Sequence, residues 1–141
     1  MNLNDLYEKI KYIAQLKVGV NSVYTEDPYS AWNTHDVKYG SLSVYIEGGN
    51  VVDNIITYNV NMYWGDRITE TGDNIFQIQS EAINIINDIV LDLEQCEDIV
   101  GITYNTFTVF KQKFVDFLAG AYTTIQVSTP KDNCIIMDSN I

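Results

Sequence analysis

The sequence contains few of the residues on which catalysis and metal binding usually depend. His35 is the only histidine, so a zinc site built on several histidines is excluded. Cys96 and Cys134 are too few for a disulfide framework. We expect both to be reduced, in a cytoplasmic setting, with Cys134 buried among apolar neighbours. No nucleophile elbow, phosphate-binding glycine motif or Cys-x-x-Cys pair occurs. The sequence therefore predicts no enzyme, no cofactor and no metal site.

Positive charge is also scarce. Eight lysines and arginines stand against nineteen acidic residues, which gives a formal net charge of −11. A protein that grips nucleic acid needs a positive patch to displace counterions from phosphates, and the lysines here are scattered. The acidic balance favours solubility through self-repulsion, and an acidic wall would also let DNA slide past without sticking.

Long apolar runs are missing. No stretch approaches the roughly 20 apolar residues that span a bilayer. The first residues carry neither a basic region nor an apolar run, so we expect no signal peptide and no membrane association.

The periodicity of apolar residues predicts the secondary structure. Residues 4–17 repeat at helical spacing, with Asn4 as the expected N-cap. Residues 18–37 are predicted to form a long connection rich in aromatic residues. Strands are predicted at 42–46, 56–64, 99–113 and 121–128, with a hairpin turn at 48–50. A long helix is predicted at 74–95, capped by Asp73.

This order of elements predicts an α+β fold. We expect a four-stranded antiparallel sheet with two helices packed on one face, and a long aromatic-rich loop after the first helix. Residues 1–130 should form a single domain, and residues 131–141 a C-terminal extension.

The long helix carries apolar residues on two sides. Its main stripe consists of Ile75, Ile78, Ala82, Ile85, Ile86, Ile89 and Leu93. A second stripe, Phe76, Ile83 and Val90, repeats every seven residues. A helix that lies on a sheet needs only one apolar face. The second stripe therefore predicts a contact with another subunit.

Two polar features suggest contacts with partners. The outer sheet face is expected to be polar but uncharged, through Ser41, Ser43, Thr57, Asn59, Asn61, Thr124, Gln126 and Ser128. Such a face is either plainly exposed, or it meets a protein or lines a passage. Asp66 and Arg67 end the second hairpin strand, where they form either a bridge to the next subunit or a local turn with an exposed ion pair worth little.

The whole arrangement resembles a known family. The chain has an N-terminal helix, a long hairpin ending in Trp64-Gly65-Asp66-Arg67-Ile68, and a long helix at 74–95. An aromatic-rich strand then leads into residues 114–120, and a last strand closes at Val127-Ser128-Thr129-Pro130. Between Leu3 and Cys134 these features resemble the tail-terminator and tail-completion (neck ring) proteins of tailed bacteriophages.

The resemblance implies a structural virion protein in the neck or tail, assembled in the bacterial cytoplasm. It implies a homo-oligomeric ring, with six or twelve subunits both reasonable, that joins a portal or adaptor to the tail. DNA would pass through the lumen during ejection without specific binding. We expect the subunit interface to include Asp66, Arg67, Phe76, Ile83 and Val90. We expect a partner-docking loop to include Tyr24, Tyr29 and Trp32.

Two other functions remain open from the sequence alone. A small ligand-binding module would bind glycan or peptide through the aromatic residues of the 24–32 loop. An acid/base enzyme would have to use Glu47, Asp66 or Asp116. No pair among these carboxylates is placed by the sequence in contrasting environments, as acid and base roles require.

Overall fold

The computed structural model describes residues 1–104, 106–114 and 116–131. Its elements are α1 (Leu3–Gln15), β1 (Ser22–Tyr24), α2 (Pro28–Thr34), β2 (Ser41–Val52), β3 (Ile55–Arg67), α3 (Ile75–Glu94), β4 (Gly101–Thr103), β5 (Thr108–Lys113) and β6 (Phe117–Pro130). The predicted extension from residue 132 onward, including Cys134, lies outside the described residues. No helix of the described chain is long and apolar enough to cross a bilayer.

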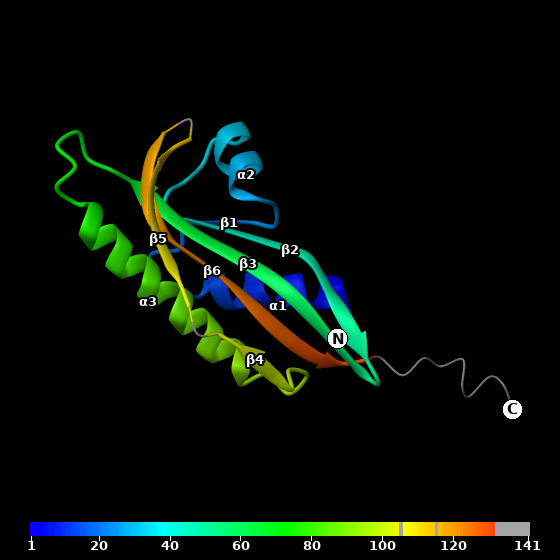
Figure 1. Cartoon of the computed structure of the whole chain (residues 1–141). Helices are drawn as coiled ribbons and strands as arrows, with labels where there is room; N and C mark the ends of the chain where they lie inside the picture. The colour runs from blue at the N-terminus through cyan, green and yellow to red at the C-terminus, as the bar shows by residue number, and fades with distance from the viewer. Residues whose placement is uncertain (105, 115, 132–141) are drawn as a thin grey trace, which may run out of the picture.

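The predicted four-stranded antiparallel sheet with two helices is wrong. The structure has three helices and a six-stranded mixed sheet in the order β1-β2-β3-β6-β4, and β5 also pairs with β6. β1 runs parallel to β2, and all the other pairs are antiparallel. Figure 1 shows α1 and α3 on one face of the sheet and α2 on the other.

The error has two causes, and the first is the connection at 18–37. Asp27 accepts a hydrogen bond from the Ser30 backbone N–H, and Pro28 follows at the first helical position. This cap and the fixed φ of proline start a short helix where turn residues predicted a loop. Ser22–Tyr24 adds a strand because it lies in register with Ser41–Ser43.

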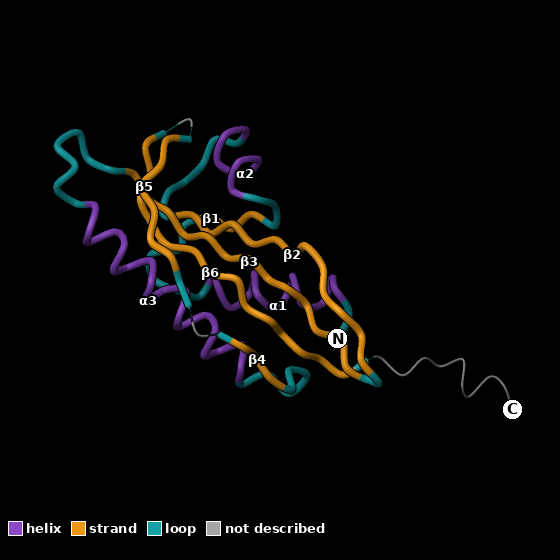
Figure 2. Tube along the Cα trace, in the orientation of Figure 1, coloured by secondary structure: helices purple, strands orange, loops and turns teal. Residues whose placement is uncertain are grey.

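The second cause is the predicted strand at 99–113, which is two strands. β4 pairs with Ser128–Gln126 and β5 pairs with Tyr122–Phe117, so both lie against β6 at different heights. The alternation of apolar residues changes parity near Thr106, and this change marks the break between β4 and β5. Figure 2 shows loop between these two strand segments.

The hairpin is longer than predicted. Val51 and Val52 still pair with Ile56 and Ile55, so the turn falls at Asp53-Asn54 and not at residues 48–50. The register shifts between Ile46 and Gly48, where the glycine has a φ of 151°. The glycines therefore form a β-bulge in the strand, a role that glycine also fills.

The helices begin close to their predicted positions, but their caps differ. Asn2 caps α1, because its side chain accepts from the Asp5 backbone N–H and Asp5 accepts in return from the Asn2 N–H. This is a capping box two residues before the expected Asn4 cap. Asn74 stands at the cap position of α3 without a capping hydrogen bond, and Asp73 instead accepts from the Thr69 hydroxyl.

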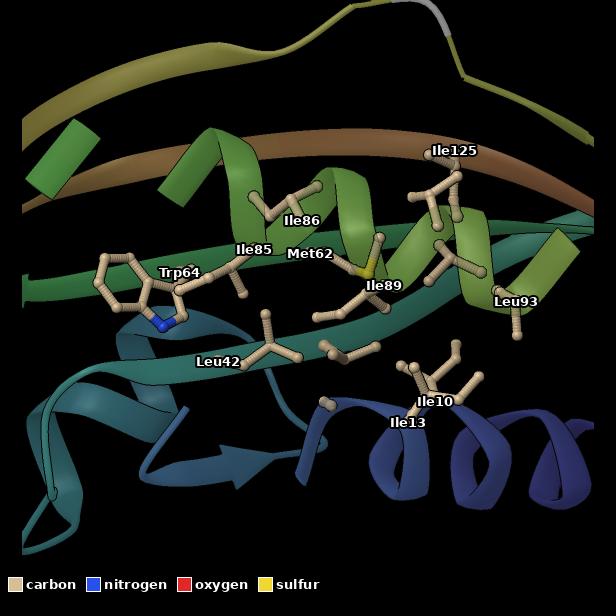
Figure 3. Close-up of a cluster of buried hydrophobic side chains, with 14 of the residues drawn as sticks. Ile10, Ile13, Leu42, Met62, Trp64, Ile85, Ile86, Ile89, Leu93 and Ile125 are labelled. Atoms are coloured by element: carbon tan, nitrogen blue, oxygen red, sulfur yellow. The ribbon is translucent and has the colours of Figure 1, made fainter. Parts of the chain in front are cut away.

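The main core lies between the sheet and the pair α1 and α3. Figure 3 shows Ile10 and Ile13 of α1 and Ile85, Ile86, Ile89 and Leu93 of α3 facing Leu42, Met62, Trp64 and Ile125 of the sheet. All of these side chains are buried. The predicted main stripe of the long helix is thus the face that packs on the sheet. Because several of its isoleucines are weak helix formers, this packing is what stabilises α3.

A second, smaller core lies on the opposite face, under α2. Ala31 and Trp32 pack there against Phe114 and Leu118. α2 covers Ser41 and Ser43, which are fully buried and not on an exposed polar face as predicted. The aromatic-rich connection is therefore part of the subunit's own fold.

Candidate subunit interfaces

The Asp66–Arg67 step lies where β3 ends, but the two side chains do not pair with each other. Asp66 Oδ1 accepts a hydrogen bond of 2.8 Å from the Arg67 backbone N–H. The Arg67 guanidinium instead lies 3.3 Å from Asp116 Oδ2, in the turn before β6. It also lies over the Tyr39 ring, 5.0 Å from the ring centre. Sequence analysis gave Asp116 and Tyr39 no part in this site, because only the fold brings residues this distant in sequence together.

Tyr39 completes the cluster around Arg67. Its hydroxyl donates a 3.0 Å hydrogen bond to the same Asp116 oxygen. Burial, together with this hydrogen bond to a carboxylate, raises the pKa of Tyr39 to about 12. Tyr39 is therefore a neutral donor at physiological pH. The Arg67 side chain remains 63% exposed, so it is still accessible to a partner.

A polar hollow opens beside this cluster. Its volume is about 640 Å³, and it is lined by Asn21, Val37, Lys38, Tyr39, Asp66 and Arg67. Both signs of charge occur along its wall. A hollow of this kind suits polar contacts with a protein, because exposed ion pairs give orientation more than stability.

The predicted docking loop divides into buried and exposed residues. Trp32 is 1% exposed, and its indole N–H donates to Ser41 Oγ at 3.0 Å. Tyr24 stacks on His35 with ring centres 4.8 Å apart. Tyr29 is 57% exposed, and its hydroxyl accepts a 2.8 Å hydrogen bond from Gln112 Nε2. Of the predicted docking residues, Tyr29 therefore offers the largest surface to a partner, while Trp32 is not at the surface.

The second stripe of α3 also divides. Val90 is fully buried in the main core, and Ile83 is partly buried against it. Phe76 is 83% exposed. A hollow of about 260 Å³ lies at the middle residue of the stripe. It is lined by Ile83, Asn84, Asn87, Tyr104 and Phe107. The described chain thus buries Val90 fully and Ile83 partly with its own residues, and it leaves Phe76 exposed.

The acidic residues gather around α3. From Ile68 to Phe110 the sequence has no lysine or arginine, and it has Glu70, Asp73, Glu81, Asp88, Asp92, Glu94, Glu97 and Asp98. Asp92 in this segment forms an ion pair with Lys17, which lies just after α1. The other carboxylates named here are all on exposed residues. The surface around α3 is therefore negative.

The outer face of the sheet carries a row of tyrosines, beside the core under α2, that sequence analysis did not identify as a group. Tyr63 and Tyr122 stack with ring centres 4.7 Å apart, and Tyr45 stacks on Tyr63 at 6.3 Å. Tyr63 and Tyr122 are directly opposite across β3 and β6. Their outward positions in the alternating strands were the available signal. Burial is the main cause that raises the pKa values of Tyr45 and Tyr63.

Uncharged side chains continue this face toward the hairpin. Asn61 accepts from the Thr124 hydroxyl at 2.6 Å, and Thr57 and Ser128 hydroxyls lie 2.9 Å apart. These cross-strand pairs link β3 to β6 on this face, while the buried Asn61 Nδ2 has no hydrogen-bond partner among the described residues. Between α2 and the hairpin, the outer face of the sheet is thus uncharged, as predicted. It differs in this from the negative surface around α3.

The candidate metal ligands and acid/base carboxylates lie apart in the described residues. No group of three or more potential ligands lies together there. The lone histidine, His35, pairs with Glu26. Glu47 lies on the hairpin, far along β2 from the Asp66 and Asp116 end of the sheet.

No protein-family model matches this chain, and no curated protein matches it significantly. The resemblance to phage tail-terminator proteins therefore rests on the order of elements and the local patterns alone.

Proposed function

We propose that this protein is a ring-forming structural subunit of a tailed bacteriophage, placed at the head–tail junction or the tail end. The ring connects a portal or adaptor to the tail and leaves a central channel for DNA. Assembly takes place in the bacterial cytoplasm, and the finished ring is part of the virion.

The separation of charge carries this proposal. One side of the subunit, around α3, is acidic without a single lysine or arginine between Ile68 and Phe110. The outer sheet face is uncharged below α2. In a ring, an acidic side turned to the lumen repels the DNA backbone, so that DNA moves through without binding. An uncharged face is suited to protein contacts, because burying it leaves no unpaired charge.

Exposed apolar side chains give the second support. Phe76 on α3, Val18 after α1 and Val52 on the hairpin are all largely exposed. They lie on different parts of the surface. A head-to-tail ring needs two different patches on each subunit, so that one patch meets the other around the closed circle.

Two measurements test the proposal. Mass photometry and negative-stain electron microscopy of the purified protein, alone and mixed with candidate portal and tail proteins, should show closed rings. A gel-shift titration with duplex DNA at low salt should show no complex. A protein that stays monomeric with every such partner, or that binds duplex DNA tightly at low salt, contradicts the proposed function.

A further inference from the structure

The sheet is longer than the helix beneath its hairpin end. β3 has 13 residues and so spans about 43 Å, at roughly 3.3 Å per residue. α1 also has 13 residues but spans only about 20 Å, at 1.5 Å per residue. Figure 1 shows the hairpin tip reaching beyond the N-terminus of α1. The core face of the sheet therefore continues past the end of its helical cover.

An apolar groove lies on this uncovered part. Its volume is about 400 Å³, and its wall includes the side chains of Leu3, Ile46, Val51, Ile56 and Tyr58. Leu3 and Val51 are both exposed, while Ile46, Ile56 and Tyr58 are partly buried. The groove is thus mainly apolar, with Glu47, Asn50 and Thr57 also along its wall, and it faces solvent in the described structure.

The chain returns to this groove at its C-terminal end. Pro130 pairs with Ile55 at the last rung of β6, and the Lys131 N–H donates to the Asn54 carbonyl at 2.6 Å. Ten more residues follow, 132–141, and they include the uncharged run Cys134-Ile135-Ile136-Met137. Extended chain advances about 3.3 Å per residue, so the length of chain that separates Lys131 from this run can span at most roughly 10–20 Å. Ile56 and Tyr58 are opposite Thr129 and Val127, only a few rungs back from Pro130.

We propose that residues 134–137 of the same molecule occupy this groove and act as its apolar cover. The short distance from Lys131 gives the molecule's own tail a high effective concentration at the groove. This contact does not depend on the proposed function.

The hairpin offers a matched pair of positions for a test. Val51 and Val52 are neighbours, and they are 61% and 62% exposed. Val51 pairs with Ile56 on the core face, so Val52, one residue further, faces the opposite side of the sheet. Two variants, V51C and V52C, are made with Cys96→Ser, so that Cys134 is the only other thiol in each. Mild oxidation then forms a disulfide, and mass spectrometry follows its rate.

We expect the disulfide from Cys134 to position 51 to form at least tenfold faster than the one to position 52. Each rate is divided by the rate at which the same introduced thiol reacts with a small reagent in a Cys134→Ser background. Replacing Ile135 and Ile136 by Asp should remove the preference for position 51. Equal normalised rates at both positions overturn the proposal. Disulfide-linked dimers on a non-reducing gel also overturn it, because they identify a second copy as the occupant.

Discussion

The indole N–H of Trp32 donates a 3.0 Å hydrogen bond to the hydroxyl of Ser41, and both residues are buried. Trp32 lies in α2 and Ser41 begins β2, so this bond attaches the short helix to the outer face of the sheet. The Ser22 hydroxyl lies 2.9 Å from the same Ser41 oxygen. One buried serine thus joins β1, α2 and β2.

Trp32→Ala should be strongly destabilising. It removes a buried aromatic ring that meets Phe114 edge-on at 5.1 Å, and such truncations cost about 3–5 kcal/mol of unfolding free energy. Trp32→Phe keeps most of the ring but removes the bond to Ser41, for a smaller loss of roughly 1–3 kcal/mol. Urea denaturation followed by circular dichroism measures both. A Trp32→Ala protein as stable as the wild type would show that this second core is not formed.

Asp27→Ala should destabilise α2 in a pH-dependent way. The pKa of Asp27 is lowered below its usual value of 3.8, and the main cause is the hydrogen bond that its carboxylate accepts from the Ser30 backbone N–H. Because the carboxyl of Asp27 has a lower pKa in the folded state than in the unfolded state, it stabilises the fold at pH values above its unfolded-state pKa. This stabilisation is lost as the pH falls through the folded-state pKa. Loss of an N-cap costs about 1 kcal/mol near pH 7.

Denaturation curves of wild type and Asp27→Ala at several pH values test this effect. The difference in unfolding free energy between the two proteins should have its full value at pH 7 and should decrease only below about pH 4. Asp27→Asn is the matched control, because asparagine also caps helices but carries no charge. Its stability should lack the pH dependence that Asp27 contributes. A gap that persists unchanged at pH 2 would contradict the assigned cap.

Arg67→Ala and Asp66→Ala should each weaken ring assembly if these residues meet the next subunit. Asp116→Ala is the control, because it removes the internal partner of Arg67 and leaves the guanidinium free. Light scattering should show fewer rings for the first two variants and retained rings for Asp116→Ala. Unchanged assembly in both Asp66→Ala and Arg67→Ala would remove these residues from the interface.

Substitutions at Phe76 and Val90 should distinguish an effect on ring assembly from an effect on the stability of the subunit. Phe76→Ser changes an exposed side chain, so the unfolding free energy of the monomer should stay within about 0.5 kcal/mol while assembly weakens. Val90→Ala removes buried methyl groups and should cost about 2 kcal/mol. Denaturation and mass photometry on the same samples measure both effects. Full assembly by Phe76→Ser would exclude α3's exposed end from the contact.

The strong periodic segments of this chain were predictable, and the weak ones were not. The helix periodicity at 74–95 and the alternation at 56–64 identified α3 and β3, because each has one face committed to the core. β1 and α2 are short, and they lie in the connection at 18–37, where turn residues predicted a loop. β4 lies within the strand predicted at 99–113, but its separation from β5 was not predicted. Their form depends on partners distant in sequence, such as Ser41–Ser43 for β1.

The candidate interface residues also divide into features that local sequence predicts and features that depend on distant parts of the chain. The sequence by itself determined the excess of negative charge, the scarcity of histidine and cysteine, and the main apolar stripe of α3. Only the tertiary structure decided that Trp32 and Val90 are buried, that Phe76 is not, and that Arg67 pairs with Asp116. Composition and periodicity are properties of local chain, whereas burial and pairing depend on which distant segments the sheet brings together.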